Sequence, residues 1–170
     1  MWRKKSQAAE PLRVLVRHAD ASLRSEWCGK DEWRGLTGVG HRQAGAVAEM
    51  LWDLPVLRIL SSPSLRCRQT MVPLALTRGL DIEPCWQLGL QVEPEDMLDL
   101  LADPETESAV LCTHRETLQS MFGYLEGARW AFAEAGDPME KAAVWILRGI
   151  VANAKRARLE YVGSGAALLV

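Results

Sequence analysis

Four side chains suited to phosphate chemistry stand out in this chain, and each follows a short apolar run. They are Arg17, His18, Arg66 and His114. An arginine presents a planar fork of donors that stays protonated at any working pH and matches phosphoryl oxygens. A neutral histidine has a lone pair that can attack phosphorus while a backbone carbonyl holds its other ring nitrogen. The set predicts phosphoryl transfer, with His18 as the nucleophile and His114 as a catalytic donor. All four would bind the phosphate.

No metal or cofactor is expected beside these residues. Two arginines and a donor histidine could supply the positioning and charge stabilisation on which phosphoryl transfer depends. No carboxylate cluster with metal-ligand spacing accompanies the histidines. The four cysteines are dispersed and form no C-x-x-C pair. Cys112 and His114 could share a metal on spacing alone, but no further ligands are evident nearby, so buried reduced thiols are the simpler interpretation.

Alternating strands and helices must position these side chains. Apolar residues at helical spacing predict a helix that is N-capped by Thr37. A second helix should carry Arg66, kink or restart at Pro73 and end at Gly79. A short helix opens at Pro94. Apolar runs bounded by turn residues predict strands over 12–16, 56–60, 80–83, 109–112, 143–147 and 157–161, and a last long helix covers about 116–125.

This alternation predicts an α/β fold. We expect a three-layer open sheet that is mostly parallel, has an antiparallel edge and carries helices on both faces. Open sheets of this kind bind ligands outside the carboxyl ends of their strands. Arg17 and His18, the 61–66 segment and His114 are therefore expected to meet at one edge of the sheet.

Length and charge narrow the class of protein further. A chain of 170 residues suits one domain over 1–170, with an N-terminal extension over 1–11 and a C-terminal tail over 162–170. A formal net charge of -2 gives no overall basic field, which disfavours a nucleic-acid partner. Arg3-Lys4-Lys5 is not followed by the apolar core of a signal peptide, and no apolar run is long enough to span a membrane. We therefore expect a cytoplasmic protein with no membrane partner, and the oligomeric state stays open.

Four short motifs follow one another along the chain, namely Arg17-His18-Ala19-Asp20-Ala21, Arg34-Gly35-Leu36-Thr37 with Gly40, Gln43 and Ala44, Ser61-Ser62-Pro63 with Arg66, Gln69 and Thr70, and Thr113-His114. They resemble the motifs of the histidine phosphatase, or phosphoglycerate-mutase-like, superfamily. The resemblance covers about Leu12 to Tyr161, and the ordered set is more specific than any single motif. The compact length and the R-H-A-D-A form look most like the short bacterial phosphohistidine phosphatase subgroup.

The resemblance implies a metal-independent phosphatase that forms a covalent phosphohistidine intermediate on His18. Its substrate would be a phosphohistidine protein or a small phosphorylated compound. Two alternatives stay open, namely a catalytically weak phosphate-binding module and a general small-molecule phosphomonoesterase. Trp27 and Trp33 follow the nucleophile in a loop and could form a substrate rim, whereas His41 belongs to no motif and is expected to be structural.

Three positions depart from the family's pattern. Gly35 stands where a proline is usual, which should affect the stiffness of the loop. Arg115 follows the second histidine where glycine is common, so it either narrows the phosphate pocket or points away from it. Segment 87–90 lacks the glutamate that larger members use as a proton donor, which mildly favours a phosphohistidine substrate. The substitutes that can be considered are Asp20, Glu93, Glu95 and Glu116.

Overall fold

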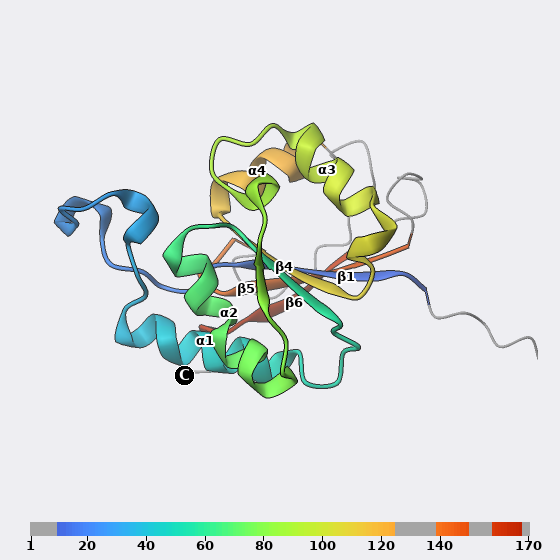
Figure 1. Ribbon diagram of the computed structural model, residues 1–170, viewed down its shortest axis with the longest axis horizontal. Helices are drawn as coiled ribbons and strands as arrows, with labels where there is room; N and C mark the ends of the chain where they lie inside the picture. The colour runs from blue at the N-terminus through green and yellow to red at the C-terminus, as the bar shows by residue number, and fades with distance from the viewer. Residues whose placement is uncertain (1–9, 125–138, 150–157, 168–170) are drawn as a thin grey trace, which may run out of the picture.

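The computed structural model describes residues 10–124, 139–149 and 158–167, which form one six-stranded sheet with helices on both faces (Figure 1). The order of the strands across the sheet is β3-β2-β4-β1-β5-β6. Their bounds are β1 (Leu12–Arg17), β2 (Arg58–Ser61), β3 (Ile82–Pro84), β4 (Ala109–Thr113), β5 (Ala143–Arg148) and β6 (Arg158–Ser164).

The sheet has a parallel part and an antiparallel edge. β1 pairs parallel with β4, β4 with β2, and β2 with β3. β5 pairs antiparallel with β1, and β6 pairs antiparallel with β5. Every residue of β1 and β4 is buried, which is why these central strands read as continuous apolar runs rather than as alternating patterns. The predicted α/β class and its antiparallel edge are confirmed.

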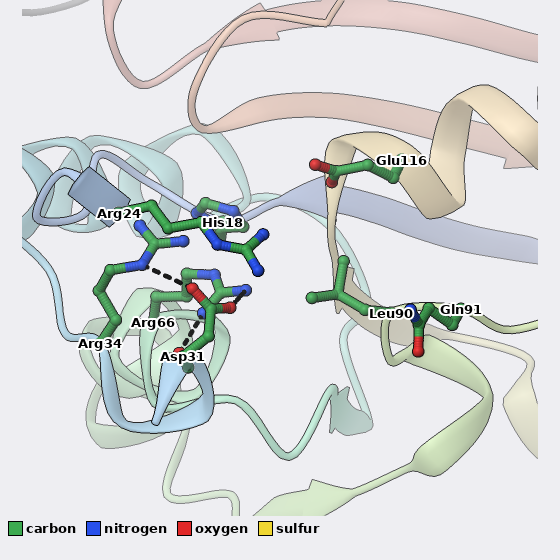
Figure 2. Close-up of a pocket in the computed structure, with 8 residues that line it drawn as sticks. All are labelled: His18, Arg24, Asp31, Arg34, Arg66, Leu90, Gln91 and Glu116. Atoms are coloured by element: carbon green, nitrogen blue, oxygen red, sulfur yellow. Dashed lines mark hydrogen bonds and ion pairs between the residues drawn. The ribbon is translucent and has the colours of Figure 1, made fainter. Parts of the chain in front are cut away.

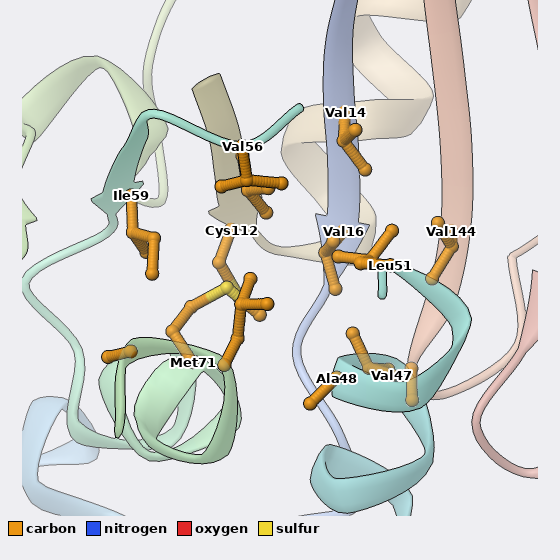
Figure 3. Close-up of a cluster of buried hydrophobic side chains, with 14 of the residues drawn as sticks. Val14, Val16, Val47, Ala48, Leu51, Val56, Ile59, Met71, Cys112 and Val144 are labelled. Carbon is orange, nitrogen blue, oxygen red and sulfur yellow. The ribbon is translucent and has the colours of Figure 1, made fainter. Parts of the chain in front are cut away.

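The helices form one layer on each face of the sheet (Figure 1). On one face, Leu51 and Met71 pack with Val16 and Ile59 of the sheet in the cluster drawn in Figure 3. On the other face, a second apolar cluster gathers around Trp145. The first layer consists of α1 (Gly38–Met50) and α2 (Leu65–Arg78), and the second of α3 (Pro94–Ala102) and α4 (Arg115–Tyr124).

Two of the predicted helix caps are confirmed. Thr37 precedes α1 in an extended conformation, and its Oγ1 accepts a hydrogen bond of 3.0 Å from the backbone amide of Gly40. Gly79 ends α2 with a φ of 64°, a left-handed conformation that glycine adopts at little cost. The cap at Thr37 marks the start of α1, and the cap at Gly79 marks the end of α2.

The sequence predicts a kink or restart at Pro73, and the structure shows no restart there. Met71 and Leu74 of the same helix are buried against the sheet. Their packing outweighs the one backbone hydrogen bond that a proline removes from a helix. β6 continues to Ser164, so the end of this strand lies in the segment expected to be a tail.

Several predicted features fall partly outside the described residues. These are residues 1–9 of the extension, residue 125 of the last helix, residue 157 of the last strand, and residues 168–170 of the tail. In the ranges that the structure describes, no helix has the length and apolar character that crossing a membrane requires.

Candidate active site

His18 stands immediately after β1, where the strand leaves the sheet. Its backbone amide donates to the carbonyl oxygen of Thr113 at the end of β4, over 3.0 Å. Its ring nitrogen Nδ1 lies 2.8 Å from the carbonyl oxygen of Ala19. A carbonyl oxygen can only accept, so Nδ1 carries the ring proton and Nε2 keeps a free lone pair. The sheet therefore presents a histidine of defined tautomer at its carboxyl edge.

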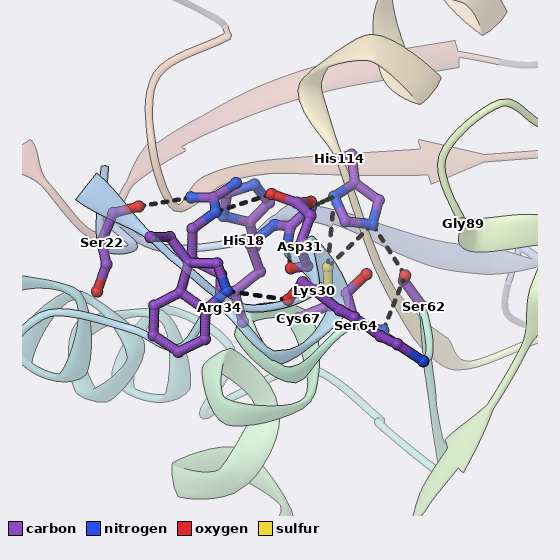
Figure 4. Close-up of polar contacts among 12 residues, drawn as sticks. His18, Ser22, Lys30, Asp31, Arg34, Ser62, Ser64, Cys67, Gly89 and His114 are labelled. Atoms are coloured by element: carbon purple, nitrogen blue, oxygen red, sulfur yellow. Dashed lines mark hydrogen bonds and ion pairs between the residues drawn. The ribbon is translucent and has the colours of Figure 1, made fainter. Parts of the chain in front are cut away.

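His114 follows β4 and lies beside His18 (Figure 4), and Arg66 of α2 contacts His114. The rings of His18 and His114 are 5.4 Å apart between centroids, at 66°. Arg66, in the first turn of α2, places Nη2 3.3 Å from Nδ1 of His114. His114 Nε2 lies 2.8 Å from Oγ of Ser62. A guanidinium can only donate, so Nδ1 of His114 accepts and its Nε2 donates to Ser62.

Arg17 is the last residue of β1 and is buried next to His18. Its Nη1 donates to the carbonyl oxygen of Met139. Burial lowers the pKa of His18 well below its ordinary value, and the neighbouring His114, Arg66 and Arg17 lower this pKa further, against the hydrogen bond to the Ala19 carbonyl. His18 is therefore neutral at pH 7. Arg17 thus acts on His18 electrostatically, although it is not among the residues that line the pocket.

An open pocket of about 420 Å³ lies in front of His18 (Figure 2). Three arginines and two carboxylates take part in its wall, so its charge is suited to an anion. The charged residues of the 18–34 segment and Arg66 stand on one side of the view, and Glu116 stands on the other. The lining residues are His18, Arg24, Asp31, Arg34, Arg66, Leu90, Gln91 and Glu116.

Asp31 is bound to two of these arginines. Its Oδ2 accepts from Arg66 Nη2 at 2.9 Å, and its backbone carbonyl oxygen accepts from Arg66 Nη1 at 2.8 Å. Its Oδ1 accepts from Arg34 Nε, also at 2.9 Å. Partial burial would raise the pKa of Asp31, but the hydrogen bond from Arg34 and the charge of Arg66 hold it below its usual value. Asp31 is therefore an anion that already occupies donors in the pocket.

The loop that follows His18 is locked by the second motif. Asp20 donates its backbone amide to Gln43 Oε1 at 2.8 Å, and its Oδ2 accepts from Thr37 Oγ1 at 2.6 Å. A Cβ at Gly40 would stand 1.9 Å from the carbonyl oxygen of Asp20, so only glycine permits this contact. The motif residues thus hold the turn that follows His18.

The third motif holds the same region from the side of α2. Thr70 Oγ1 accepts from the backbone amide of Ala19 at 3.0 Å, and Gln69 Oε1 accepts from the backbone amide of Leu36 at 2.8 Å. A Cβ at Gly35 would lie 3.0 Å from the same Gln69 oxygen, which is a very tight contact. Glycine at the position where the family usually has proline therefore allows Gln69 to approach the loop closely.

One of the four candidate proton donors lines the pocket. Glu116 is exposed in the first turn of α4 and is a lining residue. Asp20 is instead bound by Thr37 and by Lys141, whose Nζ lies 3.0 Å from Oδ1. The remaining two candidates, Glu93 and Glu95 at the start of α3, do not line the pocket.

Segment 87–90, which carries the acid in larger family members, reaches the pocket with Leu90, and the next residue, Gln91, lines it as well. Arg115 is exposed and absent from the pocket wall, so it leaves the phosphate pocket open. Trp27 and Trp33 are exposed and do not line this pocket, and the hypothesis that they form a substrate rim stays a prediction.

The sequence did not predict that Arg24, Asp31 and Arg34 line the pocket. Arg34 belongs to a motif but was given no role, and its place at the start of that motif could have drawn attention to it. Asp31 lies three residues before Arg34, and nothing in the spacing distinguishes this pair from a surface ion pair. Among the described residues, no group of three or more histidine, cysteine, aspartate or glutamate side chains could hold a metal ion.

Comparison with known proteins agrees with the motifs. The model of the histidine phosphatase superfamily (branch 1) matches residues 13–88. Together with the sheet order and the histidine–arginine cluster, this match confirms the resemblance to that superfamily. No curated protein gives a significant match.

Solved structures of phosphatases share the fold. A putative phosphohistidine phosphatase SixA from Agrobacterium tumefaciens is 24% identical, with 91% of this chain and 97% of that chain covered and a TM-score of 0.64. A protein histidine phosphatase SixA complexed with tungstate is 19% identical, with 92% and 99% covered and a TM-score of 0.70. A mycobacterial glucosyl-3-phosphoglycerate phosphatase complexed with inorganic phosphate is 18% identical, with 88% and 95% covered and a TM-score of 0.62.

Proposed function

We propose that this protein is a metal-independent phosphatase that transfers a phosphoryl group first to His18 and then to water. The observation that carries the proposal is the free Nε2 of a neutral His18, beside Arg66 in a pocket rich in arginine. A neutral imidazole with one fixed nitrogen is ready to act as a nucleophile. The neighbouring cations would stabilise the charge on the transferring group.

The reaction would proceed in two displacements at phosphorus. In the first, the Nε2 lone pair of His18 attacks, and the bond to the leaving group breaks with its electron pair on that group. In the second, water attacks the phosphohistidine, the P–N bond breaks, and Nε2 regains its lone pair. Arg17 and Arg66 would hold the non-bridging oxygens in both steps.

His114 would donate a hydrogen bond to a non-bridging oxygen. Its Nδ1 accepts a hydrogen bond from Arg66, so donation from Nδ1 requires the other tautomer. The hydroxyl of Ser62, which lies 2.8 Å from Nε2, can act as donor or acceptor and so suits either tautomer.

The proposed substrate is a phosphohistidine protein or a small phosphorylated compound. The similar structures support this class, since they include phosphohistidine phosphatases and a glucosyl-3-phosphoglycerate phosphatase, with tungstate or inorganic phosphate bound in two of them. Of the two carboxylates in the described pocket, Asp31 is bound to two arginines and Glu116 is exposed, so neither is held as a proton donor, which favours leaving groups that need little protonation. Phosphohistidine is such a substrate.

A substrate screen with two histidine variants tests the proposal. Phosphohistidine peptides, aryl phosphates, nucleotides and sugar phosphates are assayed in chelator with the wild type, His18→Ala and His41→Ala. His41 is exposed and outside the pocket, so its variant serves as the matched control. We expect activity in chelator that His18→Ala abolishes and His41→Ala retains, with a phosphorylated protein trapped only when His18 is present.

Other outcomes would point elsewhere. Hydrolysis that survives in His18→Ala would contradict the nucleophile. Phosphate binding without turnover of any substrate would favour the phosphate-binding module. Loss of activity in chelator, with recovery on addition of magnesium or zinc, would contradict a metal-independent mechanism.

A further inference from the structure

Arg66 is buried, and Asp31 takes up the two-pronged end of its guanidinium. Nη1 donates to the backbone carbonyl of Asp31 at 2.8 Å, and Nη2 donates to the carboxylate at 2.9 Å. Nη2 also lies 3.3 Å from His114 Nδ1. Arg66 itself is 2% exposed, so it cannot turn to solvent to find other partners. A phosphate can therefore bind both terminal nitrogens of Arg66 only in the position that Asp31 now occupies.

We propose that Asp31 competes with phosphate for Arg66 and must leave it when phosphate binds. Carboxylate and phosphate oxygens make the same charge-assisted hydrogen bonds to a guanidinium, so the two anions are alternatives on these donors. Two anions that share one partly buried site would also repel each other. The inference rests on the proposed function, because it places the substrate's phosphate on Arg66.

The segment that carries Asp31 is suited to such a displacement. Asp31 begins the one-turn helix η2 (Asp31–Trp33), which follows the equally short η1 (Arg24–Glu26), and neither contains a buried residue. The amide of Trp33 bonds locally, to the carbonyl oxygen of Lys30. Moving this segment therefore exposes little apolar surface, whereas His18, His114 and Arg66 are held in the core.

The competition would favour the release of product. Inorganic phosphate must break the Asp31 pair to bind, so its affinity for the free enzyme is reduced by the strength of that pair. After release, the carboxylate would return and restore the ion pairs of Asp31 with Arg66 and Arg34. A substrate gains contacts from the rest of its structure, which inorganic phosphate does not have.

Calorimetry of inorganic phosphate and of vanadate with the full chain tests the inference. Asp31→Asn keeps the shape of the side chain but removes its charge. Glu32→Gln removes the same charge from the next residue, which is exposed and makes no ion pair among the described residues. We expect the dissociation constants to fall about tenfold in Asp31→Asn and to change less than about twofold in Glu32→Gln.

The direction in which the dissociation constants change in Asp31→Asn tests the inference. Unchanged or weaker binding in Asp31→Asn would overturn the inference, because Asp31 would then position Arg66 rather than compete for it. The proposed phosphate site would still stand in that case. Failure of both the wild type and Asp31→Asn to bind either anion would overturn the proposed function, and the inference with it.

A second measurement does not depend on the folding of an Asp31 variant. Trp33 is 55% exposed and lies on the same short helix as Asp31, so its fluorescence should change when saturating phosphate displaces the segment. We expect a phosphate-dependent change in the wild type that is absent in Trp33→Phe. An identical response of the two proteins, at concentrations where calorimetry shows the site to be filled, would overturn the inference.

Discussion

The two walls of the pocket are held in different ways. The inner wall consists of His18 and Arg66, which are buried after β1 and in the first turn of α2. His114, after β4, contacts Arg66 but does not line the pocket. The outer wall over residues 24–34 consists of exposed and half-buried side chains on two single-turn helices. Its main links to the rest of the molecule are the polar contacts of Asp31 and Arg34.

The proposed reaction and the access of the anion to the site would thus depend on different walls of the pocket. Under the proposed function, the groups that would hold the phosphoryl group lie on rigid elements, where surrounding hydrogen bonds fix their tautomers and directions. The groups that would admit and release the anion lie on a segment with little buried surface, which can move at low cost. The same pocket can therefore combine a preorganised centre with an adjustable entrance.

Replacing an arginine in each wall should show the largest contrast. Arg66→Ala removes a buried cation from the proposed phosphate site, so we expect kcat/KM to fall about 10³-fold. Arg24→Ala removes an exposed cation from the outer wall, and we expect a fall of about fivefold or less. Steady-state kinetics on one aryl phosphate measures both. Equal losses in the two variants would contradict the division between the walls.

The rigidity of the inner wall can be tested with two glycines of α1. Gly40→Ala would push a methyl group into the carbonyl oxygen of Asp20, so we expect a loss of about 3 kcal/mol in the free energy of unfolding. Gly45→Ala meets nothing within 4 Å and should stabilise the helix by about 0.5–1 kcal/mol. Denaturant unfolding measures both values. A Gly40→Ala protein as stable as Gly45→Ala would show that the turn after His18 is not tightly held.

The inner wall could be predicted from the sequence because its residues follow the strand pattern. Apolar runs placed β1 and β4, and the rule that ligands bind at carboxyl strand ends brought His18 and His114 to one edge. The bond from His18 Nδ1 to a backbone carbonyl was expected in kind, and the structure identifies Ala19 as the acceptor.

The outer wall could not be predicted because its contacts depend on loop geometry. Asp31 reaches Arg66 across 35 positions in the sequence, through two single-turn helices that no apolar periodicity marks. The uninterrupted course of α2 through Pro73 has a similar origin, since burial of Met71 and Leu74 decides it and local propensity does not. Tertiary contacts, rather than local sequence signals, decide both features.

The pH dependence of kcat/KM offers a smaller test of the inner wall. Burial and neighbouring cations lower the pKa of His18, so Nε2 should keep its lone pair at pH values where an exposed histidine is protonated. We expect the acidic limb of the profile to lie below the ordinary histidine pKa of about 6.5, after correction for ionisation of the substrate. A limb at or above that value would mean that His18 is more exposed to water than the structure shows.

The smallest effect is expected from Glu116→Gln, on the side of the pocket opposite to Asp31. Glu116 is the one candidate acid in the pocket wall, but it is exposed in the first turn of α4. A general acid must be held within hydrogen-bond reach of the leaving group, and an exposed side chain is not held in this way, so we expect kcat/KM to change less than about threefold for aryl and alkyl phosphates alike. The wild type itself should prefer phosphohistidine and aryl phosphates, because a positioned acid typically contributes about 10²–10⁴-fold only when the leaving group is strongly basic. The measurement is kcat/KM across phosphate esters of graded leaving-group pKa, with Glu93→Gln as the matched control outside the pocket. A loss confined to alkyl esters in Glu116→Gln, with Glu93→Gln unchanged, would identify Glu116 as the acid and place a catalytic group opposite the rigid wall.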